Sequence, residues 1–186
     1  MDIYRELFLM QQTYATLFSL TNKIQIKGDT YIDGLTSRQM MAMVAIIHLP
    51  EEETTLNNIA KKLGTTKQNV KQLIMIIQQK GFVVMMPSVH DKRSINIKIT
   101  ESGKNIIMSC GEQSLKFFTD VFQHFTTEEM EILWVLLKKM YCFDGEEQDG
   151  FEENMNYGSE AGYTKSQEKS IQEFKRLRNI AQNETN

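Results

Sequence analysis

Five long polar side chains stand at the start of one short predicted helix. They are Lys67, Gln68, Asn69, Lys71 and Gln72. Lysine ammonium groups attract phosphates, and glutamine and asparagine amides can both donate to and accept from the edge of an adenine base. The chemistry that these residue types predict is recognition of the major groove of double-stranded DNA.

The residues around this group predict a helix-turn-helix. The first apolar stripe is Leu56, Ile59, Ala60 and Leu63, and the second is Val70, Leu73, Ile74 and Ile77. Thr55 precedes the first stripe and can cap its helix, and Thr65 or Thr66 can cap the second, while Gly64 lies between the stripes where the chain must turn. The polar group therefore lies on the first exposed turns of the second helix, which is the place of a recognition helix.

A charged hairpin follows this second helix. Residues 82–85 predict a strand that ends at Pro87, and residues 94–99 alternate polar and apolar side chains, which favours a strand with one buried face. The loop between them contains His90, Asp91, Lys92 and Arg93. A helix-turn-helix followed by such a hairpin is typical of a winged helix.

Several short segments occur together in a familiar order. They are Leu35-Thr36 with Gln39, Ile59-Ala60 with Leu63-Gly64, Lys80-Gly81-Phe82-Val83, Asp91-Lys92-Arg93, and Ile99-Thr100-Glu101-Ser102-Gly103-Lys104. In order and spacing they resemble the MarR (multiple antibiotic resistance regulator) family over roughly residues 5–143. The resemblance implies a sequence-specific DNA-binding transcriptional regulator, acting as a repressor, that binds a palindromic operator as a homodimer. Its recognition helix would enter the major groove and its wing the minor groove.

The resemblance also implies which residues contact DNA. They are Thr66, Lys67, Gln68, Asn69, Lys71, Gln72, Lys92 and Arg93. Arg93 matches the family's wing arginine, and Asp91 would orient the wing by pairing with a basic side chain or a backbone donor. The chain departs from the family at Met85, where an arginine on the first wing strand is common. Taken singly, each charged residue has the alternative interpretation of a solvated surface side chain.

The fold class that these patterns predict is mainly α with a minor β part: a winged helix-turn-helix with long N- and C-terminal dimerisation helices. We expect one domain at residues 1–143, a DNA-binding core at 36–104, dimerisation helices at 2–22 and 100–143, an acidic linker at 144–163 and a helical tail at 164–186. The alternative to a homodimer is a compact monomer with one large helical core. The tail helix would dock on the partner subunit, bind another protein, or form only on contact.

Charge is divided unequally along the chain. The formal net charge is -3, but residues 61–98 contain eight lysines and arginines against one acid, a balance of +7. Residues 144–186 contain ten acids against five bases, a balance of -5. The basic segment coincides with the predicted winged helix, which favours contact with phosphates.

Other classes of protein find no support in the sequence. There is no glycine-rich phosphate loop and no nucleophile–base pair, and the three histidines lack metal-ligand spacing, so we expect no enzyme, cofactor or metal. No apolar run has the length of a membrane span, and two distant cysteines fit a reducing cytoplasm. The alternative from another class is a winged-helix protein-interaction module without an operator of its own.

The resemblance further implies a cleft for a small-molecule effector between the dimerisation helices and the winged domain. In this chain the cleft would draw on Tyr14, Phe18, Met41 and His48. The alternative for His48 is a hydrogen-bonded structural histidine, and for the methionines simple core packing.

Overall fold

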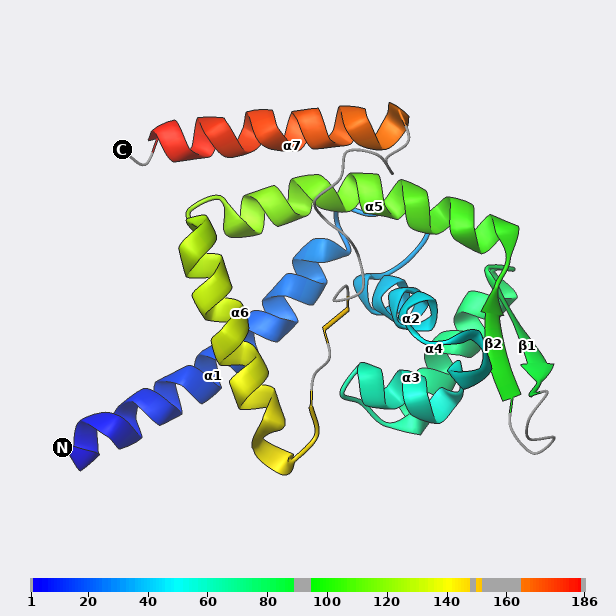
Figure 1. Cartoon of the computed structure of the whole chain (residues 1–186), viewed down its shortest axis with the longest axis horizontal. Helices are drawn as coiled ribbons and strands as arrows, with labels where there is room; N and C mark the ends of the chain where they lie inside the picture. The colour runs from blue at the N-terminus through cyan, green and yellow to red at the C-terminus, as the bar shows by residue number, and fades with distance from the viewer. Residues whose placement is uncertain (1, 89–94, 148–149, 152–164, 185–186) are drawn as a thin grey trace.

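The computed structural model describes residues 2–88, 95–147, 150–151 and 165–184 of the chain (Figure 1). In chain order the helices and strands are α1 Ile3–Gly28, α2 Ser37–His48, α3 Leu56–Lys62, α4 Lys67–Gln79, β1 Val83–Pro87, β2 Ile95–Ile99, α5 Glu101–Phe122, α6 Thr127–Tyr141 and α7 Lys165–Glu184. Two 3-10 helices, η1 Glu51–Glu53 and η2 Cys142–Asp144, complete them. The predicted fold class, mainly α with a small sheet, is confirmed.

Helices α2, α3 and α4 and the hairpin form a compact unit at one end of the molecule (Figure 1). The long helix α5 leads away from this unit, while α1 and α6 extend to the opposite side and α7 packs along α5. No helix in the described part of the chain is long and apolar enough to cross a membrane.

The core of the compact unit combines residues of the two apolar stripes predicted for α3 and α4 with residues of α2 and both strands. Its fully buried members include Met43, Ile59, Val70, Ile74, Ile77, Val83 and Ile97. Burying one such aliphatic side chain stabilises a fold by about 1.5–3 kcal/mol, so this unit has the core of a small domain.

Caps and turns set the ends of these helices. Thr36 caps α2 in a capping box with Gln39, and Thr55 and Thr66 accept hydrogen bonds from the backbones of α3 and α4. Gly64 and Gly81, with φ of 59° and 77°, turn the chain after α3 and α4 in the left-handed conformation that glycine adopts without steric cost. The predicted cap of α3 at Thr55, the threonine cap of α4 and the turn at Gly64 are confirmed.

Helix α1 is longer than predicted: it continues to Gly28 instead of ending at residue 22. No proline or glycine interrupts it before that point, and the side chain of Lys27 lies in its last turn, where the helix dipole favours a cation. A Cβ on Gly28 would lie 2.5 Å from Ser37 Oγ, so the glycine lets the end of α1 approach the start of α2 closely.

The two strands pair antiparallel, from Val83 opposite Ile99 to Pro87 opposite Ile95. Val83 and Ile97 are buried against the helices. The alternation predicted for β2 holds only in part, because Ile95 is exposed at the end of the hairpin and the polar Asn96 is buried. The hairpin loop, with His90, Asp91, Lys92 and Arg93, lies outside the described residues.

Helix α7, predicted in the C-terminal tail, packs on α5 of its own chain. The side chains of Ile171, Phe174 and Leu177 are half-buried and recur at helical spacing on one face of α7. The Arg178 guanidinium donates to the carbonyl oxygens of Phe122 and Phe125, which satisfies backbone acceptors at the end of α5.

Candidate nucleic-acid interface

The start of α4 is held by its threonine cap. Thr66 Oγ1 accepts a hydrogen bond from the Asn69 backbone N–H at 3.2 Å, and Asn69 Nδ2 donates to Thr65 Oγ1 at 3.2 Å. The cap leaves the other N–H groups of the first turn unpaired in the helix, and together with the helix dipole they favour an anion at this end. Phosphate groups are anions that commonly bind at helix N-termini for this reason.

All six residues predicted to contact DNA from α4 are exposed: Thr66, Lys67, Gln68, Asn69, Lys71 and Gln72. Val70, Ile74 and Ile77 on the opposite side are fully buried, so the orientation of the helix is set by its core face. Among the described contacts, Asn69 is the one amide of this group whose side chain is already hydrogen-bonded. The structure thus brings the residues together on one surface, while their contacts with DNA stay a prediction.

The cap leads to a first prediction. Thr66→Ala should lower the free energy of unfolding by about 1 kcal/mol, because one backbone donor loses its acceptor. Thr66→Ser keeps the hydroxyl and should retain most of the stability. Chemical denaturation of both variants measures the difference. If serine is as destabilising as alanine, the capping hydrogen bond is not what stabilises the start of α4.

Four of the eight lysines and arginines in residues 61–98 have ion-pair or hydrogen-bond partners within the described part of the chain. Lys61 pairs with Glu146, Lys62 donates to a backbone carbonyl oxygen, Lys80 binds two oxygens of the α2 region, and Lys98 pairs with Glu51. Hydrogen bonding to Lys98 lowers the pKa of the Glu51 carboxyl, and hydrogen bonding to Glu146 raises the pKa of Lys61. The balance of +7 in the sequence therefore overstates the charge that is open to phosphates.

Lys67 and Lys71 are different. Within the described residues neither of them makes an ion pair or a hydrogen bond, and both are exposed. They lie four residues apart on α4 and so on the same face of the helix. They are the described cations best placed to neutralise phosphates.

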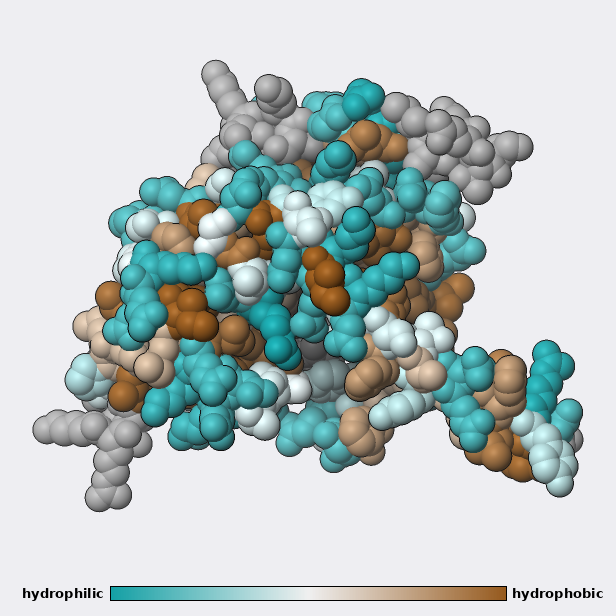
Figure 2. Space-filling view, turned by 180° about the vertical axis from the view of Figure 1, so that it is seen from behind, coloured by the Kyte–Doolittle hydropathy of each residue, from teal (hydrophilic) through white to brown (hydrophobic). Residues whose placement is uncertain are grey.

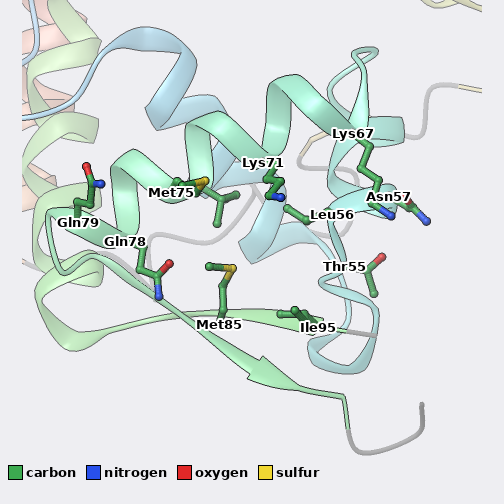
Figure 3. A pocket seen from close by; sticks show the side chains of 11 residues that line it. Thr55, Leu56, Asn57, Lys67, Lys71, Met75, Gln78, Gln79, Met85 and Ile95 are labelled. Atoms are coloured by element: carbon green, nitrogen blue, oxygen red, sulfur yellow. The ribbon is translucent and has the colours of Figure 1, made fainter. Parts of the chain in front are cut away.

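A groove of about 620 Å³ separates α4 from the sheet (Figure 3). Its walls are Thr55, Leu56, Asn57, Lys67, Lys71, Ile74, Met75, Gln78, Gln79, Met85 and Ile95. The sequence interpretation missed the contributions of Asn57, Gln78 and Gln79 to this surface. The sequence could have predicted Gln78, because it follows Lys71 by seven residues and therefore lies on the same face of α4.

Met85 lies on β1 and points into this groove toward Met75 (Figure 3). At the position where the family commonly has an arginine, the chain therefore places an apolar side chain between the recognition helix and the wing. The predicted roles of Asp91, Lys92 and Arg93 concern residues outside the described part of the chain, and they stay predictions.

The four residues predicted for an effector cleft lie on α1 and α2. Tyr14 and Phe18 are 73% and 68% exposed on α1, and Met41 is 39% exposed on α2. The His48 ring meets the Phe151 ring edge-on at 6.1 Å between centroids. Neither the groove beside α4 nor a shallow hollow on α1 includes any of the four, so this site also stays a prediction.

An exposed, capped second helix and a following hairpin on one apolar core define a winged helix-turn-helix protein. No protein-family model matches the chain. The HTH-type transcriptional regulator SarZ of Staphylococcus haemolyticus is 28% identical over 131 residues, which are 68% of this chain and 84% of SarZ. The HTH-type transcriptional repressor YetL of Bacillus subtilis is 20% identical over 132 residues, 70% of this chain and 79% of YetL.

Solved structures of similar fold cover a similar share of the chain. A MarR/EmrR family transcriptional regulator from Acinetobacter sp. ADP1 has a TM-score of 0.64 at 20% identity, over 72% of this chain and 94% of its own. MepR of S. aureus, in a complex with DNA, has a TM-score of 0.62 at 23% identity, over 69% and 95%. The organohalide-sensing regulator RdhR, bound to 2,4-dichlorophenol, has a TM-score of 0.63 at 16% identity, over 71% and 79%. The chain has the fold of MarR-family regulators, and the predicted resemblance is confirmed.

Proposed function

We propose that this protein is a DNA-binding transcriptional regulator that inserts α4 into the major groove and its wing into the minor groove. The observation that carries the proposal is the exposed polar face of α4, where Lys67 and Lys71 have no partner within the described residues. The regulator names of the relatives and the DNA complex of MepR support it. We include repression in the proposal because YetL is named a repressor.

The proposal includes a homodimer on a palindromic operator. Apolar side chains on α1, α6 and the following η2 are left without cover: Tyr4 is 83% exposed, Tyr14 73%, Val135 61% and Phe143 88%. Only Gly28 is buried in α1, and no residue is buried in α6. Figure 2 shows apolar side chains along the protruding N-terminal part of α1. A second copy would cover these faces, and its two-fold symmetry would match two half-sites.

The remaining parts of the proposal follow from this role. A regulator acts in the compartment that contains the DNA, so we place the protein in the cytoplasm, as a binding protein with no catalytic step. The ligand bound to RdhR supports a small-molecule effector for this chain too. Tyr14, Phe18, Met41 and His48 are the residues we assign to it, in a cleft that the second copy would help to close.

Neutralisation of phosphates by α4 leads to a second prediction. Lys71→Gln should weaken binding to duplex DNA several-fold at moderate salt. The slope of log affinity against log salt should fall by about 1, since one fewer counterion is released. Fluorescence anisotropy with a labelled duplex at four salt concentrations measures both quantities.

Lys80→Gln is the matched control, with the same loss of charge at the other end of α4. Lys80 Nζ donates to Gly34 O at 2.8 Å and Gln39 Oε1 at 2.9 Å, so its removal should lower stability and leave the salt slope unchanged. Equal slopes for Lys71→Gln and the unmodified protein would show that α4 does not face the phosphates.

A further inference from the structure

The chain returns from α6 to the helix-turn-helix through an acidic segment. We call residues 144–151 the acidic strap; residues 144–147 and 150–151 of it are described. Its sequence has four acids and no base. Glu146 Oε2 lies 2.6 Å from Lys61 Nζ, and Lys62 Nζ donates to Gly150 O at 3.0 Å. Both lysines at the end of α3 are therefore engaged by this segment.

Contacts on both sides of the ion pair hold the strap in place. Before it, the Tyr141 hydroxyl donates to Lys61 O at 3.3 Å, beside the turn at Gly64. After it, the Phe151 ring packs against the hydrophobic core, with Lys62 Nζ 5.4 Å from its centroid. Glu146 is thus held near Lys61 by contacts of the residues on both sides of it.

Lys61 lies on the side of α3 that faces the candidate DNA surface. Asn57 lines the groove together with Lys67 (Figure 3). Lys61 follows Asn57 by four residues, which places both on the same face of the helix. In helix-turn-helix proteins the first helix crosses the DNA backbone, so a cation on this face is within reach of a phosphate.

We propose that the acidic strap competes with DNA for Lys61, so that the protein restrains its own DNA binding. The Glu146 carboxylate and a DNA phosphate are both anions that seek the same ammonium group, and close approach of both is opposed by their mutual repulsion. DNA binding must then break the ion pair or leave Lys61 out of the interface. This inference rests on the proposed DNA-binding function and adds an internal regulator to it.

The test compares two full-length variants with the same change in charge. Glu146→Gln removes the partner of Lys61, whereas Glu147→Gln removes an exposed carboxylate that has no ion pair within the described residues. By anisotropy at low salt, Glu146→Gln should bind duplex DNA about twofold to fivefold more tightly, the range expected for one exposed ion pair. Glu147→Gln should change the affinity less, and the difference should shrink as salt rises. Equal effects of the two variants would overturn the proposal.

Two further measurements separate this proposal from the function on which it rests. Phe151→Ala releases the end of the strap without changing its charge and should also tighten binding, with a thermal melt to show that the variant is folded. A heparin column provides a polyanion that is not DNA. If no variant binds duplex DNA but Glu146→Gln elutes later than Glu147→Gln, the strap competes with polyanions for Lys61. That result contradicts the proposed DNA-binding function and leaves the competition in place. Equal elution of these two variants, with no binding to duplex, overturns both.

Discussion

Gly103→Ala is expected to lower the free energy of unfolding by about 3 kcal/mol, the upper part of the range for an overpacked site. A Cβ at this position would lie 2.1 Å from the carbonyl oxygen of Phe82 and 2.8 Å from Ile99 Cγ2. The nearest atom belongs to the backbone, so no side-chain rotation can relieve the clash. The start of α5 would have to move away from the turn between α4 and β1.

The same junction joins the winged unit to α5. The Thr100 backbone N–H donates to Phe82 O at 3.0 Å, and the Thr100 hydroxyl donates to Gly81 O at 2.7 Å. A shift of α5 would weaken both hydrogen bonds. We therefore expect Gly103→Ala to reduce DNA affinity as well as stability, because the wing would no longer be held at its angle to α4.

Gly111→Ala is the matched control on the same helix. No atom lies within 4 Å of a Cβ placed there, so alanine should stabilise α5 by about 0.5–1 kcal/mol through its better helix propensity. Urea denaturation of both variants gives the comparison. Two variants of equal stability would contradict the tight approach of α5 to Phe82.

Short-range signals in the sequence are sufficient to predict the helix-turn-helix. A threonine cap, an apolar stripe at helical spacing and a glycine at the turn act within a few residues, so Thr66, Val70 and Gly64 predict their own local structure. The sequence pattern of β2 is equally local, since alternate residues face opposite sides of a sheet. For the helix-turn-helix the structure and the sequence interpretation agree, whereas in β2 Ile95 is exposed and Asn96 is buried.

Partners distant in the sequence are not predictable in this way. Lys80 counts as a DNA-facing charge in the sequence, but its ammonium group is held by oxygens of residues 34 and 39. Phe151 lies in a segment whose composition is typical of a linker, yet its ring packs on the core. A single apolar residue among acids gives no periodic signal, and only the fold reveals that the acidic segment is anchored.

The position of Met85 shows a similar limit. The sequence shows that methionine stands where the family commonly has an arginine, but it does not indicate where the methionine side chain lies or what it contacts. In the structure the thioether extends toward Met75, and together they give the groove beside α4 an apolar floor. The groove depends on the angle between α4 and the sheet, which is set by tertiary packing and not by local pattern.

Val135→Glu on α6 is expected to convert the proposed dimer into a monomer. Val135 is 61% exposed in the single chain, so a charge there costs little before association, whereas burial of the carboxylate against a second copy would be strongly unfavourable. Loss of the second recognition helix removes the gain from linking two binding sites. We therefore expect the apparent affinity for a palindromic site to fall by about 100-fold or more. Light scattering measures the mass, and anisotropy measures the affinity.

Lys175→Gln on α7 is the control for this variant, because it changes the net charge by the same amount at an exposed polar residue outside the faces of α1 and α6. It should leave both the mass and the affinity nearly unchanged. If the unmodified protein is a monomer at the concentrations where it binds DNA, or if Val135→Glu remains a dimer, the exposed faces of α1 and α6 have another partner. A folded Val135→Glu monomer that still binds single half-sites would instead show that the winged unit recognises DNA by itself and that the dimer supplies the additional affinity.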